Sequence, residues 1–440
     1  MSQLVTTSEF RTVVGELRRQ QVIDVVRAAT FVVSLLLAWV SLRPFIDLRD
    51  AQLKALSTGN ETLTYLAFGC LAIVSIALAV RDNGPALLTL ISPGYVLFGG
   101  WMVVTVILSL DPGTSIRRFA ATVCVAAVSA TLMLLPKTQN ELIRWFSISA
   151  LALLGICYLG LLLIPNLSMH LATDLQEQAL AGDWRGSFGH KNGAAAMMAM
   201  LLFLGIYIIR SGAWLSGMAI VALASLFLVY SAGKSSLALC VAVLALTSLT
   251  AIIRSLWLRA AMLLTPLVLL NLFSVGTVMS DGLAEIAKIL PLDSSFTGRT
   301  DVWTFALQAL QLRLLTGYGF EAFWGGDAVR NLPEGMEWAA TAAHSHNGYL
   351  DTALALGLPG LVLLIAVLVV APLRNFHAAD RGGNKGPLAM VLLRIWLFGL
   401  YLSSLESFFL DRADPLWFTF LVAVFGLHYL ARFRLAEQDR

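Results

Sequence analysis

The chain has 440 residues, of which 58 % are hydrophobic and 13 % are charged, and its formal net charge is +3. A typical soluble domain is about 25 % charged and 45–50 % apolar. The composition therefore excludes a water-soluble globular enzyme, a disordered protein and a disulfide scaffold, and the small net charge gives no reason to expect nucleic acid as a partner.

Apolar runs separated by polar breaks follow one another along most of the chain, and each run is long enough to cross a bilayer as a helix. Helices are expected because the backbone must satisfy its own hydrogen bonds in lipid. We predict an all-α polytopic membrane protein with about twelve transmembrane helices. The runs cover residues 27–46, 62–80, 86–109, 117–135, 142–164, 193–210, 212–231, 235–253, 258–278, 349–372, 388–405 and 415–432.

The distribution of lysine and arginine predicts the orientation of these helices. With the N-terminus inside, seventeen of these residues fall in inner segments and nine in short outer segments. Because short loops rich in lysine and arginine face the cytoplasm, segments 1–26 and 433–440 are expected to be cytoplasmic. Helices 1–9 would then occupy 27–278, a large extracytoplasmic loop 279–348, and helices 10–12 residues 349–432.

The large loop contains a predicted amphipathic helix over residues 300–316. Trp303, Leu307, Leu310 and Leu314 recur at helical spacing there, and polar residues lie largely off this stripe. Such a helix lies on the membrane surface or caps a cavity.

A polar cluster over residues 183–193 comes just before a predicted span on the outer side. Arg185, His190, Lys191 and Asn192 gather there at an expected helix N-terminus. Backbone N–H groups at such an end favour an anion, and arginine adds bidentate phosphate recognition. The cluster either binds a substrate phosphate or forms an interfacial turn whose cations touch lipid headgroups.

Three shorter motifs lie on the same predicted side. Lys234 stands in the Ser-Ala-Gly-Lys-Ser-Ser turn at 231–236, which lacks the spacing of a nucleotide P-loop; it binds an anion or snorkels to the interface. Arg299 follows Gly298 at the start of the amphipathic helix, where it contacts a ligand or caps the surface. Gly317–Phe320 is a glycine turn that would let the backbone approach a ligand closely.

The last cluster is His344-Ser345-His346-Asn347 at the mouth of a predicted span. Histidine can take or give a proton near neutral pH, so His346 is a candidate base with His344 and Asn347 beside it. A His-x-His pair could also bind a metal. No cysteine accompanies it, however, and no cofactor or metal ligand set is predicted.

Carboxylates give little support to a metal-dependent reaction. No Asp-x-Asp sequence occurs anywhere in the chain, and fixed cations could neutralise a departing diphosphate in place of a metal. Asp47, Asp50 and Glu61 in the first outer loop leave a metal-dependent alternative open.

Together these motifs resemble the O-antigen ligase and Wzy-type polysaccharide polymerase superfamily, and the run at 185–192 is most similar to the ExoQ-like exopolysaccharide polymerase branch. The resemblance covers roughly residues 180–365. It rests on Arg-Gly-x-Phe-x-His-Lys-Asn at 185–192, the cation turn at 231–235, Gly298-Arg299 followed by Trp303, Gly317–Phe320, and His346-Asn347 followed by Gly357–Leu361.

The resemblance implies a GT-C-like fold with a large periplasmic loop in the bacterial inner membrane. It also implies a metal-independent glycosyltransferase that moves a glycan from undecaprenyl diphosphate to a sugar hydroxyl at the periplasmic face. It assigns catalysis to His346 and Arg299 and substrate binding to Arg185 and Lys234. The turn at 231–235 more often carries arginine, so Lys234 departs from the family pattern.

The resemblance also implies the partners and leaves alternative functions open. A polymerase would join lipid-linked repeat units of exopolysaccharide or O-antigen, whereas a ligase would transfer the glycan to lipid A-core. Other polysaccharide assembly proteins would be further partners. A lipid-linked sugar transporter or flippase is a more distant alternative. Such proteins usually show internal repeats and polar residues at mid-membrane, whereas the polar clusters of this sequence gather at the predicted outer face.

Overall fold

The computed structural model describes residues 7–50, 61–175, 177–289, 299–324, 329, 342–384 and 386–433. Gly298, the middle of the predicted large loop and most of the predicted C-terminal tail therefore lie outside the described residues.

Helices make up the regular structure of these ranges, apart from one isolated β-bridge between Met169 and Trp184, and the prediction of an all-α polytopic membrane protein is confirmed. The helices are α1 (Thr7–Val40), α3 (Glu61–Leu88), α4 (Pro93–Ile107), α5 (Pro112–Leu132), α6 (Gln139–Leu163), α7 (Pro165–Ser168), η1 (Gln178–Leu180), α8 (Lys191–Arg210), α9 (Trp214–Tyr230), α10 (Lys234–Leu249), α11 (Leu256–Phe273), η2 (Val275–Val278), α12 (Asp281–Ile289), α13 (Arg299–Leu312), α14 (Gly348–Leu364), η6 (Ile365–Val370), α15 (Ala371–Arg381), α16 (Pro387–Leu402) and α17 (Pro415–Leu430).

Seven helical stretches of the described chain are long and apolar enough to cross a membrane, and five further apolar helices have 10–17 residues. Each overlaps one of the predicted apolar runs. The boundaries differ most at the first run: α1 begins at Thr7 and ends at Val40, whereas the apolar run covers 27–46. The polar residues before it are good helix formers, so the helix continues beyond the apolar stretch.

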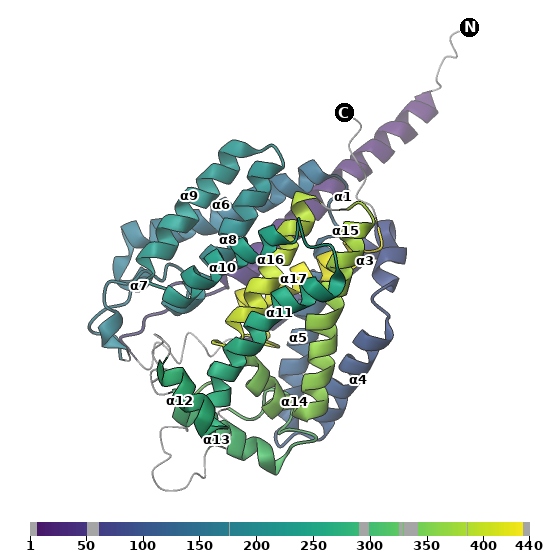
Figure 1. Cartoon of the computed structure of the whole chain (residues 1–440). Coiled ribbons are helices and arrows are strands. Elements are labelled where there is room, and N and C mark those ends of the chain that lie inside the picture. The colour runs from purple at the N-terminus through teal and green to yellow at the C-terminus, as the bar shows by residue number, and fades with distance from the viewer. Residues whose placement is uncertain are drawn as a thin grey trace.

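Helices α16 and α17 form the buried centre of the bundle (Figure 1). Nearly all their side chains are buried, and they pack on each other, with α8 and α10 against α16 and α5 against α17. By contrast, α3 and α11 expose many apolar side chains. Exposed apolar faces on a polytopic bundle are suited to lipid, so α3 and α11 are peripheral while α16 and α17 hold the core.

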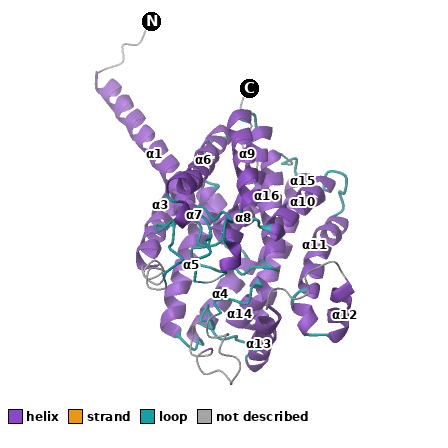
Figure 2. Ribbon diagram, turned by 90° about the vertical axis from the view of Figure 1, so that its left-hand side faces the viewer, coloured by secondary structure: helices purple, strands orange, loops and turns teal. Residues whose placement is uncertain are grey.

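Segments predicted to lie outside the membrane contact one another at one end of the bundle. The side chain of Asn192 donates a hydrogen bond to Glu406, and that of Arg185 donates to the carbonyl of Ile46. Arg412 likewise donates to Glu61. Figure 2 shows the start of α1 and helix α13 at opposite ends of the molecule. The compartment that each end faces stays a prediction.

Two glycines let the loop after α13 pack directly on the backbone of α14. Gly357 interrupts α14 with φ +69° and ψ 179°, and a Cβ there would lie 2.2 Å from the Leu315 carbonyl oxygen. A Cβ on Gly317 would lie 2.5 Å from the Leu354 oxygen. The amide of Leu358 donates to Leu314 instead of continuing the helix, so irregular backbone is satisfied inside the protein. The glycine turn at 317–320 thus approaches α14.

We predict that Gly357→Ala destabilises the protein, because its backbone conformation is accessible essentially only to glycine and costs about 1–3 kcal/mol otherwise. The backbone clash adds to this cost. Thermal unfolding in detergent should show a lower midpoint than for the wild type. Gly69→Ala is the control, since nothing lies within 4 Å of a Cβ at that helical position; an equal loss in both variants would contradict the packing argument.

Candidate functional site

The carboxylate of Glu406 brings together side chains from three distant parts of the sequence. It accepts hydrogen bonds from Asn192 Nδ2 at 3.0 Å and Arg299 Nη2 at 3.1 Å, both on Oε1. Its other oxygen lies 3.1 Å from Nδ1 of His346. Three residues predicted from separate motifs therefore meet on a fourth that the motifs did not include.

Local structure fixes the positions of Arg299 and His346. Arg299 opens α13 and also donates to the carbonyl of Leu405, which ties the helix start to the loop that carries Glu406. One turn later, Trp303 is fully buried and its indole N–H donates to the carbonyl of Ser345 at 2.8 Å. The aromatic residue of the predicted stripe thus anchors the segment next to His346, whose backbone is left-handed with φ +56°.

The electrostatics of the cluster fix the proton on His346. Burial alone would raise the pKa of Glu406, but the hydrogen bond from His346 and the charge of Arg299 outweigh it and lower the pKa to about 2. An ionised carboxylate only accepts hydrogen bonds. Nδ1 of His346 therefore carries the hydrogen toward Glu406, and in its uncharged form the ring would present the lone pair of Nε2. That nitrogen has no hydrogen-bond partner among the described residues.

His344 and Asn347, the other two predicted residues of this segment, have different surroundings. Asn347 is 1 % exposed and caps α14 by accepting from the amides of Tyr349 and Leu350. Its side-chain amide donates to Asn271 and to a backbone carbonyl, so it is a structural residue in this conformation. The ring of His344 lies edge-on to His346 with centroids 4.2 Å apart, and burial, followed by the neighbouring His346, lowers its pKa.

Arg185 is buried, with 1 % of its surface exposed. Its guanidinium donates to the backbone carbonyls of Met169, Phe188 and Ile46. These bonds hold the segment between α6 and α8 together and join it to the segment after α1. A substrate-binding role for Arg185 stays a prediction and would require the loop to rearrange.

Other residues of the 183–193 cluster form ion pairs and hydrogen bonds with neighbouring side chains. Lys191 pairs with Asp183 at 2.6 Å, and Nε2 of His190 lies 2.7 Å from Glu177. Nδ1 of His190 accepts from the amide of Asn192 and so caps α8. Among these residues, Asn192 is the one that reaches Glu406.

Lys234 opens α10 with an exposed side chain. The turn before it lies next to the first cluster, since the amide of Trp184 donates to the carbonyl of Tyr230. Lys234 is not among the residues that contact Glu406, and its role stays a prediction.

Two cavities flank the start of α14. One is an apolar groove of about 660 Å³ between α11, α13 and α14, and Leu350 and Ala353 are on its wall. The other is a polar pocket of about 480 Å³ lined by Asp351, Thr352 and Ala355. Because successive helical residues turn by about 100°, these two sets lie on opposite faces of α14. The segment before the helix continues the division, since Asn347 lines the groove and His344 lines the pocket.

Carboxylates of the first outer loop are paired with guanidinium groups. Asp47 binds Arg49 at 2.7 Å, and Glu61 binds Arg412 at 2.6 Å. The described residues contain no group of three histidine, cysteine, aspartate or glutamate side chains arranged to hold a metal ion.

Sequence reasoning missed Glu406 because it belongs to no motif that carried the resemblance. The predicted span 388–405 ends directly before it. One signal was available: an ionisable residue at the mouth of an apolar span is costly and often functional. The same reasoning applies to Asp411 and Arg412 in the loop between α16 and α17.

Comparisons with known proteins add an independent observation. Residues 219–365 match the model of the O-antigen ligase family. A stretch of 128 residues is 30 % identical to the exopolysaccharide production protein ExoQ of Rhizobium meliloti (strain 1021). This stretch covers 28 % of each of the two chains. The match therefore spans about a quarter of that relative's length.

Residues 219–365, about a third of the chain, are thus similar to the O-antigen ligase family. The expected resemblance to this superfamily, on its ExoQ-like side, is thereby confirmed. The matched region contains Lys234, Arg299, His344 and His346. Glu406 and Asn192 lie outside it, and Glu406 binds Arg299 and His346 of the matched region through the hydrogen bonds described above.

We predict that Glu406→Gln lowers the free energy of unfolding in a pH-dependent way. The pKa of Glu406 falls to about 2 in the folded protein, below its unfolded value of about 4.3. Its stabilising effect is therefore complete above about pH 4.5 and is lost as the pH falls toward 2, and it should amount to about 2–3 kcal/mol. Denaturant unfolding of both proteins in detergent between pH 7 and pH 3 measures the difference.

Glu285→Gln is the matched control, because Glu285 is 70 % exposed and pairs with a lysine in α12. That variant should track the wild type at every pH. A gap between wild type and Glu406→Gln that stays constant down to pH 3 would contradict the assignment of an ionised Glu406.

Proposed function

We propose that the protein is a membrane glycosyltransferase that moves a glycan from an undecaprenyl-diphosphate carrier to a sugar hydroxyl. The observation that carries this proposal is the cluster of Arg299, His346 and Asn192 on Glu406. Two sequence neighbours of His346 connect this cluster with the cavities, because Asn347 lines the apolar groove and His344 lines the polar pocket. Transfer from a lipid-linked sugar requires an apolar site for the lipid, a polar site for the sugars and a proton acceptor between the two.

His346 acts as the general base in this proposal. As the acceptor hydroxyl attacks the anomeric carbon, Nε2 takes its proton, and the bond between that carbon and the diphosphate oxygen breaks with its electron pair leaving on the diphosphate. Glu406 holds Nδ1 and stabilises the imidazolium that forms, as a carboxylate does behind other catalytic histidines. A base positioned in this way typically contributes about 10²–10⁴-fold in rate.

Arg299 stabilises the departing diphosphate. Its bonds to Glu406 and Leu405 use part of the five N–H donors of a guanidinium. The remaining donors can bind phosphate oxygens in the planar fork geometry that arginine provides. Lys234 and the residues His190 and Lys191 would add positive charge near the carrier if the outer loops close over it.

The apolar groove supports a polyprenyl carrier as the donor. Leu264, Val268 and Leu272 of α11 and Leu361 and Ile365 beyond the break in α14 line it, so it follows the membrane-spanning helices away from the site. Burial of apolar chain stabilises binding by about 25 cal/mol per Å². Placement in the bacterial inner membrane with the site facing the periplasm is part of this proposal, and the distribution of lysine and arginine supports the orientation.

Polymerisation of lipid-linked repeat units is the favoured reaction, because the relative named for exopolysaccharide production matches on sequence. The alternative is ligation to lipid A-core, which the description of the family model favours. Both reactions use the same donor and the same chemistry, and they differ in the acceptor.

We predict that His346→Ala abolishes transfer while leaving donor binding largely intact, with a loss of about 10²–10⁴-fold in turnover. Arg299→Ala should weaken donor binding or leaving-group stabilisation, and Arg299→Lys should restore only part of the activity because the fork is gone. The measurement is transfer from purified undecaprenyl-diphosphate-linked repeat units, with membrane insertion and donor binding checked for each variant.

His377→Ala is the matched histidine control. His377 lies in α15, beside Arg259 and toward the opposite end of the α14–α15 helical stretch, and its replacement should leave transfer unchanged. A folded His346→Ala protein with near-wild-type turnover would remove His346 as the base.

Metal independence is a separate prediction. The fixed charge of Arg299 does the work that a divalent cation performs in many transferases, so the purified enzyme should retain its transfer rate in excess EDTA. Loss of activity on chelation that is restored by Mg²⁺ or Mn²⁺ would show that a metal takes part.

A further inference from the structure

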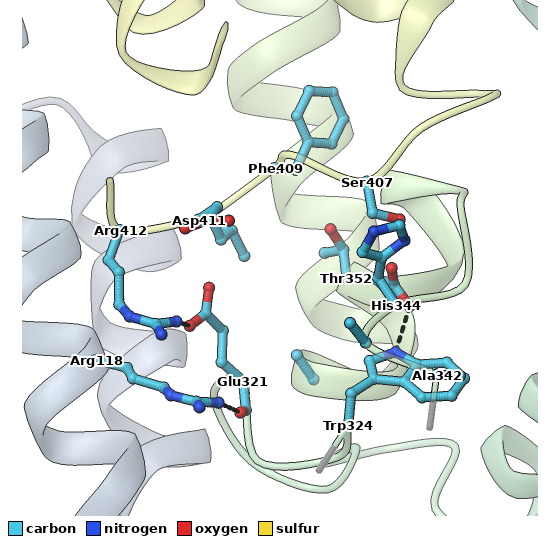
Figure 3. A pocket seen from close by; sticks show the side chains of 14 residues that line it. Arg118, Glu321, Trp324, Ala342, His344, Thr352, Ser407, Phe409, Asp411 and Arg412 are labelled. Atoms are coloured by element: carbon cyan, nitrogen blue, oxygen red, sulfur yellow. Dashed lines mark hydrogen bonds and ion pairs between the residues drawn. The ribbon is translucent and has the colours of Figure 1, made fainter. Parts of the chain in front are cut away.

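The polar pocket next to His344 contains charged and aromatic side chains that the donor chemistry does not use. Its walls come from α5, the loop after α13, α14 and the loop between α16 and α17 (Figure 3). Arg118 and Arg412 both contact Glu321: Arg118 donates to its backbone carbonyl, and Arg412 binds its carboxylate at 2.8 Å. On the opposite wall, the indole N–H of Trp324 donates to Asp351 at 2.8 Å.

The charge of this pocket is wrong for a diphosphate. Three carboxylates, on Glu321, Asp351 and Asp411, face two guanidinium groups, on Arg118 and Arg412. Burial and the neighbouring Asp411 raise the pKa of Glu321 to about 7, but the other two carboxylates still match the two guanidinium groups. The described lining therefore offers another anion no excess positive charge. A neutral molecule with many hydroxyls suits it better, because carboxylates accept and guanidinium groups donate hydrogen bonds, while the apolar face of Trp324 offers a surface for a sugar ring.

Asp411 is the carboxylate best placed to bind such a molecule. Glu321 is paired with Arg412, and Asp351 accepts from Trp324 and from the amide of Ser345. Asp411 accepts one long bond, of 3.3 Å, from the amide of Ala413, and it forms no ion pair with another described residue. Its carboxylate therefore keeps acceptor capacity for a hydroxyl in the pocket.

The position of the pocket relates it to the proposed reaction. His344 lines it, and the ring of His344 contacts His346. The apolar groove lies on the other face of α14, so the two cavities reach the His346 segment from opposite sides. The volume of about 480 Å³ lies within the range of about 300–1,000 Å³ that small-molecule sites occupy.

We propose that this pocket is the acceptor site and binds the terminal sugars of a neutral glycan, with Asp411 as a hydrogen-bond acceptor for a sugar hydroxyl. This inference rests on the proposed glycosyl transfer and adds to it the class of ligand and the side from which the acceptor approaches. The carrier lipid and its diphosphate occupy the other side of α14.

Direct binding tests the site without requiring turnover. The probe is a one-repeat oligosaccharide released from the surface polysaccharide of the source bacterium and tagged with a fluorophore at its reducing end, so that it lacks a diphosphate and can act only as acceptor. Fluorescence anisotropy with the full-length protein in nanodiscs should show saturable binding. Asp411→Asn should weaken it about 10- to 100-fold, as expected for loss of a charged hydrogen bond.

A second variant blocks the pocket by volume. Ala343 lines it with an exposed side chain, so Ala343→Phe should fold and should abolish binding of the probe. The matched controls are Glu285→Gln for the loss of an outer carboxylate and Ala181→Phe for an added ring at an exposed alanine of another outer loop. Both should bind the probe as the wild type does.

Competition and transfer separate this inference from the proposed function. Undecaprenyl diphosphate alone should not displace the probe, because it occupies the groove. Displacement, absence of wild-type binding, or equal binding by Asp411→Asn and Ala343→Phe would overturn the acceptor site. Probe binding with the expected variant pattern but no transfer from a lipid-linked donor would leave the acceptor site in place and overturn the proposed reaction.

Discussion

Glu406 accepts hydrogen bonds from α8, from the first residue of α13 and from the segment before α14, and so connects three parts of the bundle that are distant in the sequence. An ionised carboxylate that is largely buried is costly unless cations and donors surround it. That requirement draws Arg299 and His346 to one point, even though 47 residues of sequence, many of them in a long loop, separate the two positions. The same bonds set the proton on His346, so the electrostatic constraint and the proposed chemistry have one origin.

The sequence predicted the helical architecture well, because hydrophobic length and backbone satisfaction in lipid leave few alternatives. It also predicted that α13 is a helix with Trp303 on its buried side. Helix limits were less accurate. The polar start of α1 and the continuation of α14 through η6 into α15 depend on local propensity and packing rather than on apolar length.

Individual site residues were harder to assign, for physical reasons that differ from residue to residue. Arg185 looked available for phosphate, yet three backbone carbonyls satisfy its guanidinium, and only the three-dimensional course of the loops reveals them. The amide of Asn347 is likewise used by the cap of α14 and by neighbouring groups. Glu406 belongs to none of the sequence motifs, and its place in the site is evident only from its hydrogen bonds with residues far away in the sequence. Residue types can indicate a chemistry, whereas the partners of each polar group decide which residue is free to perform it.

The first turns of α14 separate the apolar groove, lined by Leu350 and Ala353, from the polar pocket, lined by Asp351 and Thr352. Within the proposed function, this arrangement allows the residues that bind the acceptor sugar to change independently of those that bind the lipid. Substitutions on the polar face could alter which sugar is accepted, while the apolar face would continue to bind the proposed carrier lipid. A transferase of the proposed kind could therefore change its acceptor specificity through one face of a single helix without altering the other face.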